Sequence, residues 1–145
     1  MATAIAPKVA TLYELQTAYL EPRFRQLGIN SATFQMLMTI YAAGPELPQA
    51  EIARRLGISA PTLSETVRLH ITRGLLEQIP SVLDRRRKSL VLTKRAKTIL
   101  TKLLDEIQSL EKQLVKGLGN KELKAAGSVL DHCATRLEAL IANQS

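Results

Sequence analysis

Two short helix-favouring segments separated by a three-residue turn are the strongest constraint on this 145-residue chain. The segments are residues 49–56 and 60–73. Gly57 can adopt the positive φ that a sharp turn after a helix prefers. Ser59 can cap the second helix, and Pro61 fits its first turn, where a missing N–H costs nothing. This spacing is typical of a helix-turn-helix.

The second helix of this pair is expected to present one face to a DNA major groove, because Leu63 and Val67 hold the opposite face against the core. Arg68 could pair with guanine or a phosphate, and Glu65 could accept a hydrogen bond from cytosine. A helix pair packed for purely structural reasons is the alternative when this motif is taken alone. The residues predicted to lie near DNA are Ser59, Ala60, Pro61, Thr62, Ser64, Glu65 and Arg68.

A basic run follows between two β-compatible segments, residues 75–80 and 89–92, which are predicted to form a hairpin. At the tip of this hairpin, arginines could enter an adjacent minor groove and lysines could neutralise phosphates. We expect Asp84 to orient a neighbouring guanidinium through a bidentate pair. A merely solvated charge run is the alternative in isolation. The residues predicted to bind DNA here are Arg85, Arg86 and Arg87.

The flanking segments have apolar residues at helical spacing. They predict helices over residues 8–26, 32–43, 93–118 and 121–143, and Pro22 predicts a kink or a break near Glu21. The apolar stripes of the outer helices exceed what a small core requires, so we expect a two-fold dimer, with packing inside one chain as the alternative. The residues assigned to dimerisation are Leu12, Leu130, Leu137, Leu140 and Ile141.

Composition narrows the possible functions. The formal net charge of +7 makes polyanions plausible partners. We recognise no Ser/His/Asp arrangement, glycine-rich phosphate loop or Cys/His cluster, so we expect no enzyme, no metal and no cofactor. Cys133 is the only cysteine, which excludes an intrachain disulfide. No apolar stretch reaches membrane-spanning length and no secretory signal is evident, so we expect a cytoplasmic protein with no membrane partner.

The order of these parts resembles the MarR family of winged-helix regulators. The most specific match is the run Asp84-Arg85-Arg86 followed by Leu92-Thr93. The other matches lie in residues 49–57, 59–64, 73–75 and at Pro80. The resemblance implies a dimer with its recognition helix in the major groove and its wing arginines, above all Arg86 and Arg85, in the minor groove. It also implies release of DNA by small aromatic or phenolic effectors.

The chain departs from the family pattern at three places. Ala96 stands where glycine is usual, and His70 stands at a core-facing position where leucine is usual. Val82 and Leu83 are apolar residues in a usually polar wing. They suggest that the wing packs against another surface. For His70 we favour a core histidine satisfied by a neighbour over a pH or ligand sensor.

For Cys133 and five aromatic residues, a structural role in the core is the alternative to sensing or ligand binding. Cys133 lies on an apolar stripe, where a small buried thiol is more common than a redox sensor. Five aromatic residues could line an effector cleft, although aromatic residues at helical spacing are more often core. They are Tyr13, Tyr19, Phe24, Phe34 and Tyr41.

These patterns favour a mainly α protein, a single protomer over 1–145. We expect a winged helix-turn-helix region at 30–96 with a small β-hairpin wing, and a helical dimerisation region at 1–29 and 97–145. The expected function is sequence-specific binding of double-stranded DNA by a homodimer on an inverted repeat, with repression as the favoured action. The alternative is a basic helical module that binds RNA or protein, although the run from Arg85 to Lys97 lacks the aromatic residues that RNA binding favours.

Overall fold

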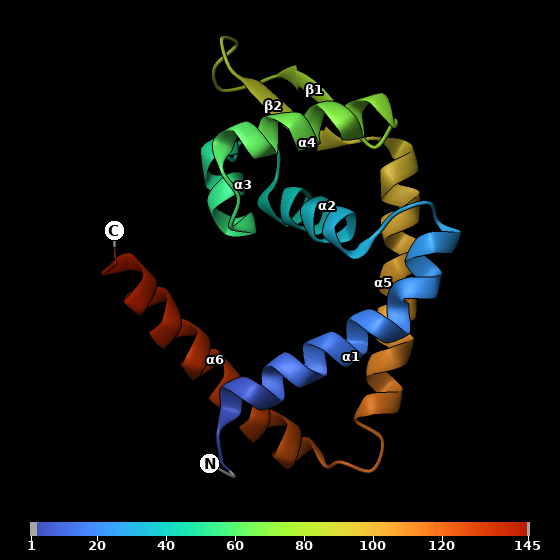
Figure 1. Cartoon of the computed structure of the whole chain (residues 1–145), viewed down its shortest axis with the longest axis vertical. Helices are drawn as coiled ribbons and strands as arrows, with labels where there is room; N and C mark the ends of the chain where they lie inside the picture. The colour runs from blue at the N-terminus through green and yellow to red at the C-terminus, as the bar shows by residue number, and fades with distance from the viewer. Residues whose placement is uncertain (1–2, 145) are drawn as a thin grey trace. The chain divides into compact units, whose positions relative to one another are not determined.

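The computed structural model describes residues 3–144, and in them the chain forms six helices and a two-stranded antiparallel sheet (Figure 1). Contacts divide the chain into two compact units, Met1–Asp105 and Glu106–Ser145. The mainly helical fold with a hairpin wing is the one predicted. The elements are α1 Ile5–Gln26, α2 Ser31–Ala43, α3 Gln49–Leu56, α4 Ala60–Thr72, β1 Leu76–Pro80, β2 Lys88–Leu92, α5 Lys94–Leu114 and α6 Asn120–Ala142.

Helix α1 continues through Pro22, so the alternative of a break near Glu21 is wrong. Proline removes one backbone hydrogen bond and leaves the carbonyl four residues earlier, that of Ala18, without its helical donor. Ala18 is exposed, so water can satisfy this carbonyl. Phe24, one turn beyond the bend-prone position, is buried and holds the end of the helix in the core.

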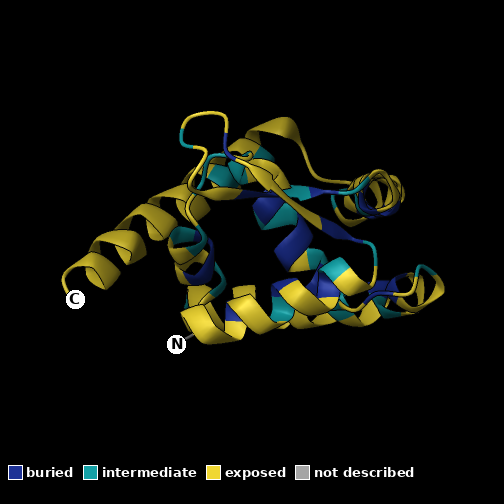
Figure 2. Ribbon diagram, turned by 90° about the horizontal axis from the view of Figure 1, so that it is seen from above, coloured by how far each residue is buried: buried dark blue, intermediate teal, exposed yellow. Residues whose placement is uncertain are grey.

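Helix α2 is the centre of the first unit. Asn30 caps it, because its side chain accepts a 2.8 Å hydrogen bond from the Thr33 backbone N–H. Met36, Leu37 and Ile40 are buried along the helix, which Figure 2 shows as a dark blue stretch at the middle of the unit. The buried apolar face of this helix fixes the positions of the shorter elements around it.

The turn between α3 and α4 has the predicted geometry. Gly57 adopts φ +67°, in the left-handed region, and the Ile58 N–H donates to the Ala53 carbonyl at 3.0 Å. The small Ala53 of α3 is buried, as are Leu63 and Val67 of α4. The turn therefore sets the direction in which α4 leaves the core.

The hairpin of β1 and β2 pairs Leu76 with Leu92 at its base and Pro80 with Lys88 near its tip. Thr93 joins the base to α5. Its hydroxyl donates to the Gly74 carbonyl at 2.7 Å and accepts from the Ala96 N–H at 3.1 Å. Ala96, where the resemblance leads one to expect glycine, is completely buried, so its methyl group is part of the core.

Helix α5 ends at Leu114, about one turn earlier than predicted, and Gly117 has a positive φ in the connection to α6. Glu122 caps α6 by accepting a 3.1 Å hydrogen bond from the Gly119 backbone N–H. Within the described part of the second unit, α6 has no buried residue. Its apolar side chains are about half exposed: Val129, Leu130, Leu137, Leu140 and Ile141.

Candidate nucleic-acid interface

The first turn of α4 is exposed and capped. The Ser59 hydroxyl accepts a 3.2 Å hydrogen bond from the Thr62 N–H and donates to the Thr62 hydroxyl at 2.8 Å. Pro61 lies in the first turn, as predicted. The remaining free N–H groups at this end carry the positive end of the helix dipole, which favours an anion.

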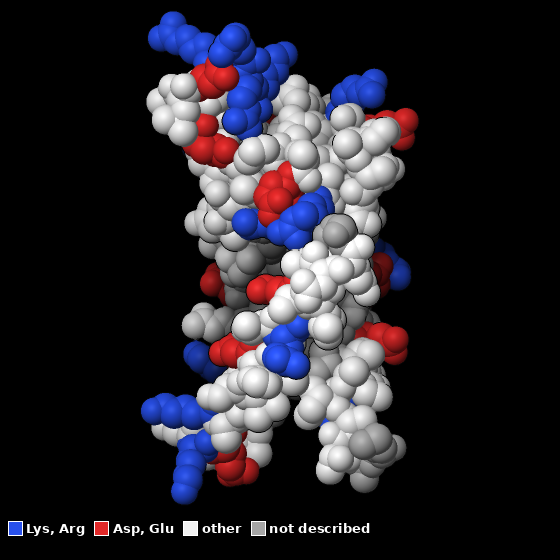
Figure 3. Space-filling model, turned by 90° about the vertical axis from the view of Figure 1, so that its left-hand side faces the viewer, with Lys and Arg blue, Asp and Glu red and all other residues white. Residues whose placement is uncertain are grey.

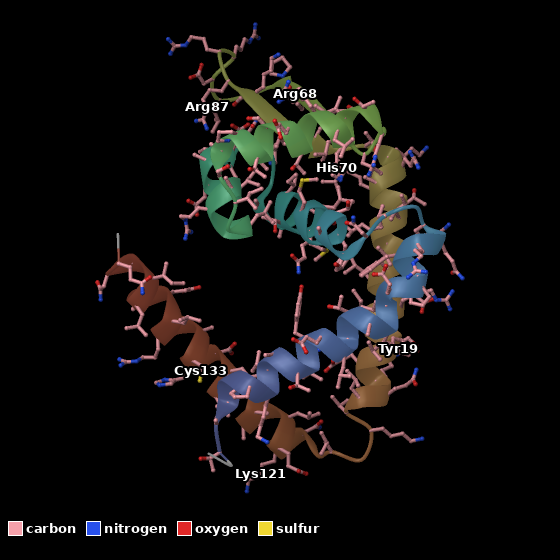
Figure 4. The ribbon with its side chains drawn as sticks, in the orientation of Figure 1. Tyr19, Arg68, His70, Arg87, Lys121 and Cys133 are labelled. Carbon is pink, nitrogen blue, oxygen red and sulfur yellow. The ribbon has the colours of Figure 1, made fainter. Side chains whose placement is uncertain are left out.

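Helix α4 has one core face and one exposed face. Leu63, Val67 and His70 are buried, whereas every α4 residue predicted to lie near DNA is exposed. Figure 4 shows Arg68 and His70 on opposite sides of the helix, with His70 toward α2 and Arg68 near the wing. The side chains that could reach a ligand are Ser59, Ala60, Pro61, Thr62, Ser64, Glu65 and Arg68.

The wing tip carries the predicted arginines on its surface, and Arg85, Arg86 and Arg87 are all exposed. Figure 3 shows Lys and Arg side chains gathered at the wing end of the first unit. Figure 4 places Arg87 at the same end as Arg68. The wing arginines and Arg68 of α4 are thus exposed at the same end of the first unit.

Asp84 holds Arg86 in a different way from the one expected. One carboxylate oxygen, Oδ1, accepts from the Arg86 backbone N–H at 3.0 Å and from the Arg86 Nε at 3.4 Å. The predicted bidentate pair is therefore wrong in its geometry, because the backbone and the guanidinium share the same oxygen. The contact still orients the Arg86 side chain, which is 93% exposed.

A buried serine connects the wing to the loop before α3, and sequence patterns did not single it out. The Ser81 hydroxyl donates to the Glu46 carboxylate at 2.6 Å and accepts from the backbone N–H groups of Leu83 and Asp84, each at 3.2 Å. Ser81 is 5% exposed. One hydroxyl therefore fixes both the tip of the wing and its attachment to the helical core.

Residues 27–87, which run from the end of α1 to the wing arginines, match the model of the MarR family. This segment is similar to the MarR family. The matched segment contains the predicted helix-turn-helix together with the first strand and the tip of the predicted wing.

Solved structures of three DNA complexes have a similar fold over nearly the whole chain. The S. aureus MepR–DNA complex is 20% identical with a TM-score of 0.76, covering 92% of this chain and 96% of MepR. Streptococcus pneumoniae FabT in complex with DNA is 19% identical with a TM-score of 0.75, covering 92% and 95%. The transcriptional repressor CouR, bound to a 23-mer DNA duplex, is 25% identical with a TM-score of 0.68, covering 90% and 92%.

His70, which departs from the MarR pattern, is a satisfied core residue, as the sequence favoured. Nδ1 lies 2.7 Å from the Thr66 carbonyl oxygen, which can only accept, so Nδ1 carries a proton. In the neutral ring, Nε2 then accepts from the Thr33 hydroxyl at 3.0 Å. Both ring nitrogens are therefore paired inside the protein.

The aromatic residues divide into core and surface. Phe24 and Phe34 stack with their ring centroids 5.4 Å apart, and Phe24 is buried, so this pair belongs to the core. Tyr13, Tyr19 and Tyr41 are exposed, and the Tyr13 hydroxyl accepts from the Gln35 side chain. Tyr41 also lines a hollow of about 170 Å³ against β2. An effector contact at any of these residues stays a prediction.

The remaining features are the single cysteine, possible metal sites and possible membrane spans. Cys133 is exposed, contrary to the buried thiol that its apolar stripe favoured. Among residues 3–144 no three His, Cys, Asp or Glu side chains form a group that could hold a metal ion. Within the same residues, no helix combines the length and the apolar character that crossing a bilayer requires.

Proposed function

We propose that this protein is a MarR-family regulator that binds double-stranded DNA of defined sequence and represses transcription as a homodimer on an inverted repeat. The observation that carries the proposal is the placement of the exposed α4 face and the arginine-rich wing at one end of the first unit. The MepR, FabT and CouR structures, whose folds are similar, are complexes with DNA. The DNA-binding region is proposed to be residues 30–96.

In this proposal α4 lies in the major groove. Its capped N-terminus approaches a phosphate, and its exposed side chains read base edges. Arg68 has the length and the paired donors to contact O6 and N7 of a guanine, and Glu65 can accept from a cytosine amino group. Thr62 and Ser64 supply shorter polar contacts beside them.

The wing lies over the adjacent minor groove. Arg85, Arg86 and Arg87 are exposed and close in sequence, so they can neutralise phosphates or enter the groove together. Asp84 limits the directions in which the Arg86 side chain can leave the loop. This restriction lowers the entropy that Arg86 loses on binding.

The dimer is proposed to use the helical regions 1–29 and 97–145. Apolar side chains that are about half exposed in the single chain would become buried against a second copy. A two-fold axis would place two α4 helices about 34 Å apart, one turn of DNA. The residues proposed for this contact are Leu12, Leu130, Leu137, Leu140 and Ile141, each between 47% and 58% exposed.

A small aromatic effector is proposed to act through the spacing of the two α4 helices. A ligand that binds better to a dimer with the wrong spacing lowers DNA affinity by its preference for that state. The exposed tyrosines Tyr13, Tyr19 and Tyr41 are the candidates for contact with it.

The test is footprinting of the purified protein on DNA that flanks its own coding region, followed by affinity measurements on the protected duplex. A protected inverted repeat is expected. Arg86→Ala should weaken binding about 10- to 100-fold and lower the slope of log K against log salt by about one. Arg25→Ala removes another exposed charge, from α1, and serves as the control; the Arg25 side chain is 77% exposed and that of Arg86 is 93% exposed. Equal binding by the Arg86 variant and the control would refute the wing assignment.

A second measurement addresses sequence reading. Arg68→Ala should reduce the affinity ratio between the operator and a random duplex by about 5- to 100-fold. An unchanged ratio would remove Arg68 from the base-reading residues. Competition by structured RNA at concentrations equal to duplex would instead support the RNA-binding alternative.

A further inference from the structure

Two apolar side chains stand at the tip of the basic wing. Val82 is 88% exposed and Leu83 is 81% exposed, the highest values among the exposed large hydrophobic residues of the described chain. Burial of such side chains is favourable in proportion to the apolar area removed from water. A pair this exposed is therefore available for contact with a partner.

The loop holds these side chains in a defined position. Ser81 is anchored to Glu46, and the Ser81 N–H donates to the Arg87 carbonyl at 2.9 Å. The Arg87 N–H donates in turn to the Asp84 carbonyl at 3.0 Å. With the bonds from the Leu83 and Asp84 amides to the Ser81 hydroxyl, the backbone is fixed on both sides of the apolar pair. A partner would therefore meet a preorganised tip.

The charge around the pair selects the partner. Residues 85–88 are three arginines and a lysine, all exposed, and they follow Leu83 after a single aspartate. A second basic wing would be repelled, whereas a polyanion would be attracted. A DNA duplex offers both required features, because phosphates line the rims of its minor groove and deoxyribose C–H groups form its walls.

We propose that Val82 and Leu83 form an apolar wing-tip contact that packs against the deoxyribose walls of the minor groove beside the wing arginines. This inference rests on the proposed function, because it needs a DNA duplex under the wing. The arginines supply the salt-dependent part of the affinity, and the apolar pair supplies a part that does not depend on salt. The pair also has no net charge, so it releases no counterions.

Two double variants with matched shapes test the proposal. V82T/L83N replaces the pair with polar side chains of nearly the same size, and V82I/L83M keeps the pair apolar. Affinity for the operator duplex is measured from low to high salt. We expect V82T/L83N to bind about tenfold more weakly at every salt concentration with an unchanged slope. V82I/L83M should stay within about twofold of the wild type.

Each other outcome has a definite meaning. Wild-type affinity in V82T/L83N, or equal losses in both double variants, would overturn the apolar contact. A change of slope would mean that the pair acts only through the arginines, which also overturns it. A changed dimer mass, or loss of binding to anionic vesicles with duplex binding intact, would assign the pair to another partner. Absence of duplex binding by the wild type would instead refute the proposed function.

Thermal midpoints separate a contact from a folding defect. Both side chains are exposed, so neither double variant should shift the midpoint of the free protein by more than about 2 °C. A large loss of stability in V82T/L83N would make the pair structural and would contradict the proposal. Leu83 and Asp84 amide exchange that stays slow in V82T/L83N would confirm that the loop keeps its shape.

Discussion

The Thr33 hydroxyl on α2 and Nε2 of His70 on α4 lie 3.0 Å apart, and both residues are buried. This hydrogen bond ties the exposed helix to the central helix of its unit across 37 positions in the sequence. The position of α4, and hence of Arg68 on its outer side, therefore depends on a polar contact inside an apolar core.

Thr33→Val should destabilise the protein by about 1–3 kcal/mol, because the variant leaves a buried acceptor on His70 without a partner. The double variant T33V/H70L removes both polar groups, so it should recover most of this loss. Denaturant unfolding of Thr33→Val, His70→Leu and the double variant measures the coupling. Purely additive effects would contradict a direct bond between the two side chains.

Gly57→Ala should destabilise the protein by about 1 kcal/mol. Gly57 has φ +67°, and a Cβ built there meets no atom within 4 Å, so the cost is conformational and not steric. Gly57→Asn should cost less, since asparagine tolerates the left-handed region. Urea unfolding checks the order glycine, asparagine, alanine. An alanine variant as stable as the wild type would show that the turn can change its conformation freely.

The sequence predicted the helix-turn-helix and the hairpin because their signals are local. A glycine, a capping serine and apolar residues at helical spacing all lie within about 20 positions of one another. Pro22 left a kink and a break both open, and the helix continues through it with Ala18, whose carbonyl loses its donor, exposed to water. The exposure of Ala18 cannot be read from its residue type alone.

The contacts that fix the wing could not be predicted from local patterns. Glu46 and Ser81 are 35 positions apart, and each is a common residue type in a loop. Asp84 was recognised as a partner for an arginine, but its geometry depends on the backbone N–H of Arg86, which occupies the same oxygen. A contact between residues far apart in the sequence, and the sharing of one acceptor oxygen by two donors, can be recognised only in the folded structure.

Acid should weaken the contribution of Glu51 to stability. The hydrogen bond from Arg54, at 2.9 Å from Nε to Oε2, is the main cause that lowers the pKa of the Glu51 carboxyl, and Arg55 adds to it. A group with a lowered pKa in the folded state contributes stability above its unfolded pKa and loses it as the pH falls through the folded value. The window is therefore acidic, starting near the usual carboxyl pKa of about 4.3.

Glu51→Gln should accordingly lower the thermal midpoint slightly at neutral pH and by less as the pH falls below about 4. The effect stays small because Arg54 and Arg55 are largely exposed to solvent. Glu65→Gln makes the same charge change on α4 and is the control. A difference from the wild type that stays constant between pH 7 and pH 3 would argue against the ion pair as its source.

Leu137→Asp should dissociate the dimer that we propose. Leu137 is 58% exposed in the single chain, so an aspartate there costs the fold of the protomer little, while it buries an unpaired charge in a two-fold contact. Sedimentation should show a monomer with helical content near that of the wild type and with operator affinity reduced at least about 100-fold, because two half-sites no longer bind together. Leu137→Met keeps the volume and the apolar surface, and it should remain dimeric. A stable, fully dimeric Leu137→Asp variant would exclude this stretch of α6 from the interface, and the pairing of two α4 helices would then have to depend on other residues of the proposed dimerisation region.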